Sequence, residues 1–133
     1  MKMRCNMPKQ KNWIEIYPLR VGDYAAAVTL WQGCDGIRVS QENASEKFFR
    51  HFVARNSGLC LGAWEADRLI GAVLVSHDRR RAYLYHLAIA GTHRQQGIGR
   101  RLMQAVLKEL SRIDLSKAHL LVETDNDARL NFW

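Results

Sequence analysis

An arginine and two glycines stand directly before a segment with helical periodicity. In HRQQGIGRRLM, residues 93–103, Arg94 precedes Gly97 and Gly99 by a few positions. The first amides of a helix have no partner within the helix and lie at the positive end of its dipole. Glycine lets a ligand approach these amides, and arginine offers a fork of donors to phosphate oxygens. The segment is therefore predicted to bind a pyrophosphate.

Two common phosphate-binding motifs do not fit this segment. A Walker A loop needs Lys and then Ser or Thr after its last glycine, whereas Arg100 and Arg101 follow Gly99. A Rossmann fingerprint needs a third glycine at the position where this chain has Leu102. That fingerprint also needs an early βαβ position, which residues 93–103 do not have. An arginine before a Gly-x-Gly turn, between a strand and a helix, does fit the sequence.

The apolar pattern around this loop predicts an α/β fold with one mixed sheet. The predicted strands cover residues 14–20, 59–66, 69–76, 82–90 and 118–124. The predicted helices begin at Asp23, after Ser45, after Gly97 and at Ala128. The resulting order is β-α-α-β-β-β-α-β-α.

Local signals predict several details of these elements. Asp23 is expected to cap the amides of Tyr24–Ala26, and that helix is expected to stop near Asp35–Gly36. Asp67–Arg68 is expected to form a tight hairpin turn. Core positions are expected in the second helix at Phe48, Phe49 and Phe52. Core positions recur every four residues in the third helix, at Ile98, Leu102, Val106 and Leu110.

Length and charge restrict the classes of function. The chain has 133 residues, which predicts one domain at residues 13–133 after a flexible tail at residues 1–12. Its net charge of +7 favours anionic partners. Nucleic acid, anionic lipid and a polyphosphate cofactor all fit that charge.

The cysteines and the apolar runs argue for a cytoplasmic protein. Cys5, Cys34 and Cys60 are an odd, widely spaced set, which favours reduced thiols over disulfides or a metal site. No apolar segment follows the basic start MKMRCNMPKQK, so no secretory signal is predicted. The longest apolar runs are too short to cross a bilayer.

The strand, loop and helix at LAIAGTHRQQGIGRRLM, residues 87–103, resemble the acetyl-CoA-binding motif of the GNAT superfamily of N-acetyltransferases, in its small single-domain bacterial form. EIYPLRVGDYAAAVTLW is similar to the first strand and helix of that family, and VETDNDARLNFW to its strand, Asn and aromatic helix. The resemblance covers about residues 14–133. It implies a mixed, mostly antiparallel sheet flanked by helices, and direct transfer of an acetyl group from acetyl-CoA to a primary amine.

The resemblance also implies roles for particular residues. The backbone of Leu87, Ala88 and Ile89 would bind the pantetheine arm, and one of its amides would polarise the thioester carbonyl. Asn126 would contact the same arm. The pyrophosphate would be held by Arg94, Gln95, Gln96, Gly97, Ile98, Gly99 and Arg100.

Three side chains are candidates for proton transfer. Tyr85 and His86 lie just before the strand expected to bind the thioester, and Glu123 lies on the fifth strand. Each also has a plain structural interpretation. Strand aromatics and a strand histidine usually pack, and Glu123 could form only a cross-strand ion pair. The acid and base therefore remain open at this point.

Two departures from the family leave alternatives open. Trp133 stands where many members have a tyrosine that protonates the leaving thiolate. The sequence also stops where the family continues into further strands, which implies missing C-terminal strands or an edge covered by a neighbour, as in a homodimer. A catalytically weak GNAT-like module that binds CoA or regulates is the main alternative. A basic nucleic-acid-binding domain is the weaker one. The acceptor, a small-molecule amine or a protein amine, is not identified by the sequence.

Overall fold

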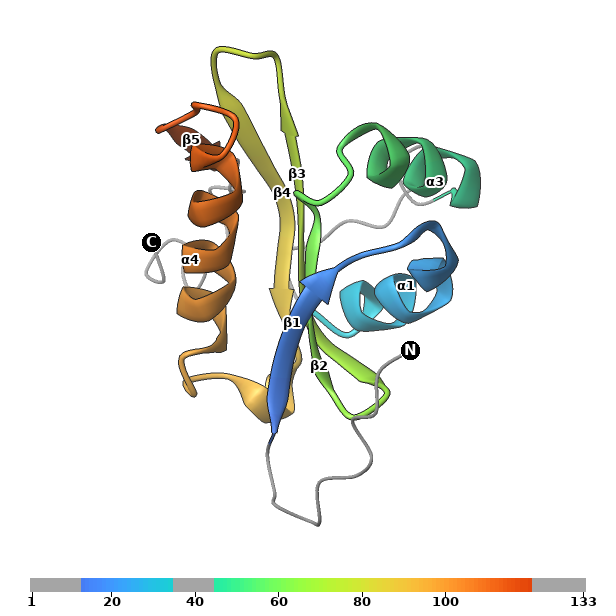
Figure 1. The fold of residues 1–133 in the computed structure, drawn as a ribbon. Helices are drawn as coiled ribbons and strands as arrows, with labels where there is room; N and C mark the ends of the chain where they lie inside the picture. Colours follow the sequence, from blue (N-terminus) through green and yellow to red (C-terminus); the bar gives the residue numbers. More distant parts are fainter. Residues whose placement is uncertain (1–12, 35–44, 121–133) are drawn as a thin grey trace.

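The described residues fold around a five-stranded sheet whose strand order is β1-β2-β3-β4-β5 (Figure 1). The computed structural model describes residues 13–34 and 45–120. The strands are Ile14–Pro18 (β1), Leu61–Glu65 (β2), Arg68–His77 (β3), Ala82–Ile89 (β4) and Ala118–Leu120 (β5). Neighbouring strands run antiparallel except β4 and β5, which are parallel. The predicted mixed, mostly antiparallel sheet is therefore confirmed.

Helices cover both faces of the sheet. Helices α1 (Tyr24–Gln32) and α3 (Glu46–Arg55) lie on one face, and α4 (Ile98–Ser111) lies on the other (Figure 1). Two short 3₁₀ turns complete the described elements, namely η2 (Val21–Asp23) before α1 and η3 (Gly91–His93) before α4. The predicted order of elements is confirmed as far as β5.

The strand β3 forms part of two hydrophobic cores. Ile70, Val73 and Val75 belong to the core beneath α4. Leu69, Ala72 and Leu74 belong to the core beneath α1 and α3. A strand covered on both faces is continuously apolar rather than alternating. This explains why LIGAVLV has no polar residue.

Helix α4 has the spacing that the sequence predicted. Ile98, Leu102, Val106 and Leu110 are all buried against the sheet. Residues four apart lie on the same face of a helix, so this row forms one apolar stripe. The row fixes the rotation of α4, and therefore the direction of its first amides.

Helix α3 begins and ends where the sequence indicated, but its apolar face is narrower. The Ser45 hydroxyl accepts a hydrogen bond from the Phe48 amide at 3.1 Å, and the helix ends at Asn56. Phe49 and Val53 are buried. The prediction of a core position at Phe48 is wrong, since this side chain is 37% exposed and contacts the ring of Phe52.

Three other local predictions need correction. Asp23 does not cap Tyr24–Ala26, because it lies within the preceding turn and its carboxylate accepts the Arg20 amide at 2.8 Å. The hairpin turn between β2 and β3 is Ala66–Asp67, one residue earlier than predicted, with Ala66 at φ 56°. The first strand ends at Pro18, and Leu19 packs into the core beneath α1 and α3.

Other predictions fall on residues that the structure does not describe. These are the tail at residues 1–12, the helix stop at Asp35–Gly36, the remainder of the fifth strand and the helix beginning at Ala128. In the described part, α1 ends earlier, at Gln32, with Gly33 as its cap. No helix among the described residues is long and apolar enough to cross a membrane.

We expect α4 to be held mainly by its buried row. Leu102→Ala should lower the free energy of unfolding by about 2–5 kcal/mol, because it deletes a fully buried side chain and leaves a cavity. Leu107→Ala is the matched control on the same helix, at a site that is 45% exposed, and should change it by about 0.5 kcal/mol or less. Urea unfolding followed by circular dichroism measures both. Equal losses would contradict the orientation of α4.

Candidate functional site

The strand β4 contains one extra residue at its centre. Leu74 of β3 pairs with Tyr85, and Ala72 pairs with Ala88. The single residue Val73 therefore faces both His86 and Leu87, which defines a β-bulge. His86 has φ 55°, a left-handed conformation that is uncommon for any residue except glycine.

The bulge changes which side chains share a face. Tyr85 contacts the ring of Phe52 at a centroid distance of 5.9 Å, and His86 contacts the ring of Trp31 at 5.1 Å. Both neighbours therefore face the side of α1 and α3, although successive residues of a regular strand alternate. Leu87 then returns to the core beneath α4. The bulge thus places two candidate proton-transfer groups, Tyr85 and His86, next to each other.

A buried tryptophan holds the bulge. The indole nitrogen of Trp31 donates a hydrogen bond to the backbone carbonyl of His86 at 3.1 Å, and Trp31 is only 2% exposed. The sequence indicated Trp31 as a helix residue and contained no sign of this contact. The two residues are 55 positions apart, and no motif links them.

The segment after β4 turns back on its own strand. The Ala90 amide donates to the Ile70 carbonyl at 2.8 Å, which fixes the start of the loop to β3. The Nε of Arg94 donates to the Ile89 carbonyl at 3.2 Å. Arg94 is exposed, so its terminal guanidinium nitrogens remain accessible to an anion at the end of β4.

The N-terminus of α4 presents amide donors toward this loop. Gly97 caps the helix at φ 80° and ψ 8°, and Gln95 is also left-handed at φ 63°. The first helical hydrogen bond runs from the Arg101 amide to the Gly97 carbonyl at 3.0 Å. The preceding helical amides therefore have no acceptor within the helix, and they are suited to bind an anion. These amides belong to Ile98, Gly99 and Arg100.

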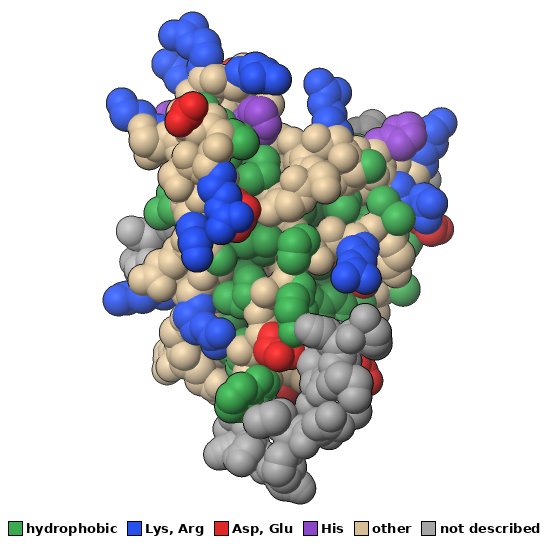
Figure 2. Space-filling model, viewed as in Figure 1, with side chains coloured by type: hydrophobic (Ala, Val, Ile, Leu, Met, Phe, Trp, Pro, Cys, Tyr) green, Lys and Arg blue, Asp and Glu red, His purple; other side chains and the backbone are tan. Residues whose placement is uncertain are grey.

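The cationic side chains near this end of α4 differ in their availability. A terminal nitrogen of Arg101 donates to the Ile14 carbonyl at 3.0 Å, so Arg101 covers the edge strand β1. Arg100 and Arg94 are exposed. Figure 2 shows further Lys and Arg side chains along α4 and at the turn between β3 and β4. A positive field around the predicted anion site follows from this distribution.

The arginine triplet of the β3–β4 turn has a structural explanation. The Asp78 carboxylate accepts the amides of Arg80 and Arg81 at 2.9 and 2.8 Å. These hydrogen bonds, that from Arg81 first, hold the pKa of the Asp78 carboxyl below its usual range. Arg79 adopts φ 75° in the same turn. The triplet Arg79–Arg81 therefore forms an exposed turn at the tip of the hairpin, and the Asp78 carboxylate binds two of its amides.

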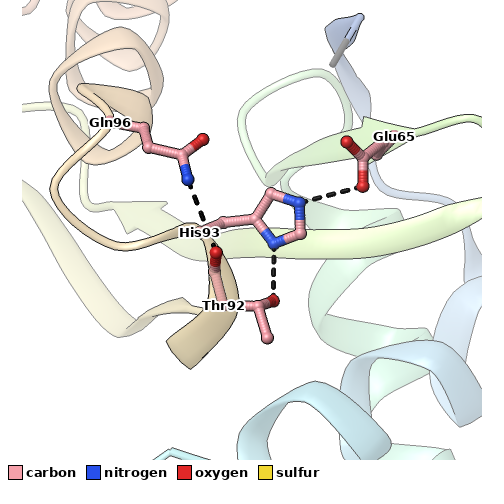
Figure 3. Close-up of polar contacts among 4 residues, drawn as sticks. All are labelled: Glu65, Thr92, His93 and Gln96. Atoms are coloured by element: carbon pink, nitrogen blue, oxygen red, sulfur yellow. Dashed lines mark hydrogen bonds and ion pairs between the residues drawn. The ribbon is translucent and has the colours of Figure 1, made fainter. Parts of the chain in front are cut away.

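A histidine next to Arg94 ties the loop to a distant strand (Figure 3). His93 is only 8% exposed, and its Nε2 lies 2.9 Å from a carboxylate oxygen of Glu65, the last residue of β2. Its Nδ1 lies 2.7 Å from the Thr92 hydroxyl. The side chain of Gln96 donates to the Thr92 carbonyl at 3.4 Å. Sequence reasoning missed His93 and Glu65 because nothing in their spacing connects them.

The described cysteines are free and buried, at Cys34 and Cys60. Burial raises the pKa of the Cys60 thiol to about 11, although its hydrogen bond from the Val75 amide acts in the opposite direction. Cys60 is therefore protonated at neutral pH and unsuited to act as a nucleophile. Among residues 13–34 and 45–120, no group of three or more His, Cys, Asp or Glu could hold a metal ion.

The predicted site residues fall into two sets. Within the described chain, Leu87–Ile89 form the end of β4, and Arg94–Arg100 form the loop and the first turn of α4. Tyr85 and His86 lie at the bulge just before them. Glu123, Asn126 and Trp133 lie outside the described residues.

The chain is similar in sequence to known acetyltransferases. The family model described as "Acetyltransferase (GNAT) family" matches residues 24–133. An acetyltransferase of Pectobacterium atrosepticum is 30% identical over 120 residues, which are 90% of this chain and 84% of the relative.

Solved structures show the same fold. The PaiA N-acetyltransferase of Thermoplasma acidophilum, solved in complex with coenzyme A, is similar with a TM-score of 0.81 and 21% identity over 91% of this chain and 86% of that chain. A ribosomal-protein-alanine N-acetyltransferase of Brucella melitensis has a TM-score of 0.70 and 16% identity over 91% and 88% of the two chains.

Because Gly97 caps α4 in a left-handed conformation, replacement of this glycine should destabilise the fold. Gly97→Ala should lower the free energy of unfolding by about 1–2 kcal/mol, because an L-residue is strained at φ 80° although the added methyl group meets no atom. Gly91→Ala is the matched control. Its added methyl group also meets no atom within 4 Å, but no positive φ is required there. Thermal or urea unfolding compares the two, and equal effects would refute the assigned role of the backbone.

Proposed function

The chain belongs to the GNAT family of acetyltransferases, and we propose that it transfers the acetyl group of acetyl-CoA to a primary amine. The observation that carries this proposal is the N-terminus of α4, where three amides without helical partners lie beside an exposed Arg94. The similar fold of the PaiA N-acetyltransferase, which was solved with coenzyme A, supports the choice of cofactor.

The residues at the proposed cofactor site fit a pyrophosphate. The amides at Gln95–Arg100 and the guanidinium of Arg94 are donors, and Gly97 adds no side chain that would block them. The backbone of Leu87–Ile89 is proposed to bind the pantetheine arm as a pseudo-strand. Asn126, outside the described residues, is proposed to contact the same arm. When bound, acetyl-CoA supplies an acetyl group activated as a thioester.

The proposed reaction is a direct transfer. The neutral amine forms a C–N bond to the acetyl carbon, the C–S bond breaks, and the proton lost by the amine balances the proton gained by the thiolate. A backbone amide of Leu87–Ile89 would stabilise the oxyanion.

We propose that two described side chains take part in the proton transfers. His86 and Tyr85 share one face at the bulge, immediately before the proposed thioester-binding backbone. His86 is our first candidate for the base, because a neutral imidazole accepts a proton readily. Tyr85 is the second, and Glu123 remains a proposal from the sequence alone.

The acceptor is proposed only as a class, a small-molecule amine or a protein amine. Similar folds serve different acceptors, and the Brucella melitensis protein is described as acting on ribosomal-protein alanine. The free thiols of Cys34 and Cys60 favour a reducing compartment such as the cytoplasm. A panel of amines assayed for CoA release tests the proposal. Binding of acetyl-CoA with no turnover on any amine would favour a regulatory module instead.

Acetyl-CoA should stabilise the protein through Arg94. At a hundred times its dissociation constant, a ligand raises the free energy of unfolding by about 2.7 kcal/mol, so the melting temperature should rise. Arg94→Ala should weaken binding by about 1.5–3 kcal/mol, because a charged hydrogen bond is lost.

Arg112→Ala is the control for this measurement, since it removes the same charge from an exposed site at the far end of α4. Thermal shift and calorimetric titration measure both variants. Equal weakening would mean that only the net charge matters, and no shift in the wild type would overturn the proposed cofactor.

Proton transfer at the bulge should depend on His86. His86→Asn is the informative substitution, because asparagine also tolerates a positive φ and so preserves the bulge. If His86 is the base, kcat/KM should fall about 10²–10⁴-fold with acetyl-CoA affinity unchanged. Tyr85→Phe, which removes only a hydroxyl, is measured beside it with the best amine of the panel. A wild-type rate in His86→Asn would exclude His86 as the base.

A further inference from the structure

The loop that carries the proposed cofactor site is joined to strand β2 by a contact between two side chains, His93 of the loop and Glu65 of the strand. His93 immediately precedes Arg94 and is nearly buried, although its neighbours from Arg94 to Gly97 are exposed. Its partner Glu65 lies at the end of β2. Because β3 lies between β2 and β4 in the sheet, the contact reaches across the end of one whole strand.

The chemistry of the contact makes it directional. A carboxylate only accepts hydrogen bonds, so Nε2 of His93 donates to Glu65 over 2.9 Å. In the neutral ring, Nδ1 then accepts from the Thr92 hydroxyl over 2.7 Å. Both ring nitrogens are therefore engaged, and the ring can neither rotate nor withdraw without losing a hydrogen bond (Figure 3).

The two ends of the loop are fixed in different ways. At its start the Ala90 amide binds the Ile70 carbonyl, and at its end α4 is held by its buried row. Between them, Gln95 and Gly97 keep left-handed conformations, and that of Gln95 is strained because this residue is not a glycine. Such conformations persist only where surrounding contacts enforce them. His93 provides such a contact, a side-chain hydrogen bond from this loop to a strand other than β4.

We propose that Glu65 and His93 are a positioning pair that holds residues 91–97 in the conformation able to bind the cofactor. This proposal rests on the proposed function for its effect on acetyl-CoA. The pair contacts no reacting atom and should act through Arg94 and the amides of α4. A loop that spends less time in the competent conformation binds its ligand more weakly in proportion to that fraction.

The sign of the effect separates positioning from simple electrostatics. Glu65 is an anion near a site proposed for an anionic ligand, so its charge alone opposes binding. Removal of that charge without other consequences would tighten binding. Weaker binding in Glu65→Ala would therefore arise from a misplaced loop.

The experiment compares disruptive variants with conservative ones. His93→Phe keeps the ring volume but loses both hydrogen bonds, and Glu65→Ala removes the acceptor. Each should raise the Kd and KM for acetyl-CoA about ten-fold while kcat at saturation stays within about two-fold. His93→Gln and Glu65→Gln each preserve a donor or an acceptor at the contact and should bind nearly as the wild type does. Glu109→Ala, which breaks an exposed ion pair with Arg112, is the charge control.

A second measurement needs no ligand. Amide hydrogen exchange at residues 91–100 should become faster in His93→Phe and Glu65→Ala, and should stay slow in the Gln variants. If the wild type bound no acetyl-CoA, the proposed function would fail, and this exchange experiment would still decide whether the pair orders the loop. Wild-type exchange and affinity in both disruptive variants would overturn the inference. Should His93→Phe not fold, Glu65→Ala, whose side chain is 30% exposed, decides the question alone.

Discussion

The extra residue in β4 is the constraint on which the arrangement of the site depends. Strand β4 must supply Leu84 and Leu87 to the core beneath α4 and Ala88 to the core beneath α1 and α3. Regular alternation cannot place both leucines on one face, because they are three positions apart. The bulge at His86 resolves this conflict, and the indole of Trp31 secures it. The second half of β4 leads directly into the loop and α4, so its position determines where the loop and the start of α4 lie.

Most of the fold followed from patterns that are local in sequence. The row of apolar residues in α4, the cap at Ser45 and the run of apolar residues in β3 each depend on neighbours a few positions away. The errors arose where two local solutions compete. The Asp23 carboxylate could cap the following helix or close the preceding turn. In the structure Asp23 belongs to that 3₁₀ turn, and its carboxylate accepts the Arg20 amide. Phe48 has core chemistry, but α3 buries only the stripe that contains Phe49 and Val53.

The backbone segment of the candidate site could be predicted from the sequence, but the long-range contacts that hold this segment could not. Glycine, arginine and a following helix indicated an anion site at residues 94–100, because these residue types act through their position in one continuous segment. The contacts that hold this segment join residues far apart, as Trp31 joins His86 and Glu65 joins His93. A single sequence has no local sign of such pairs. The bulge could not be predicted from the sequence either, because a positive φ is uncommon in any residue other than glycine.

The parallel pairing of β4 with β5 has a consequence for the newly made chain. Strands β2, β3 and β4 follow one another through short turns, so they can pair as soon as they leave the ribosome. Strand β5 can reach β4 only after the loop and all of α4 have been synthesised, because a parallel pair needs a crossover. The end of α4 that is proposed to bind an anion lies within that crossover. We therefore expect a nascent chain to gain affinity for the proposed cofactor only after the loop and the first turn of α4 have been synthesised.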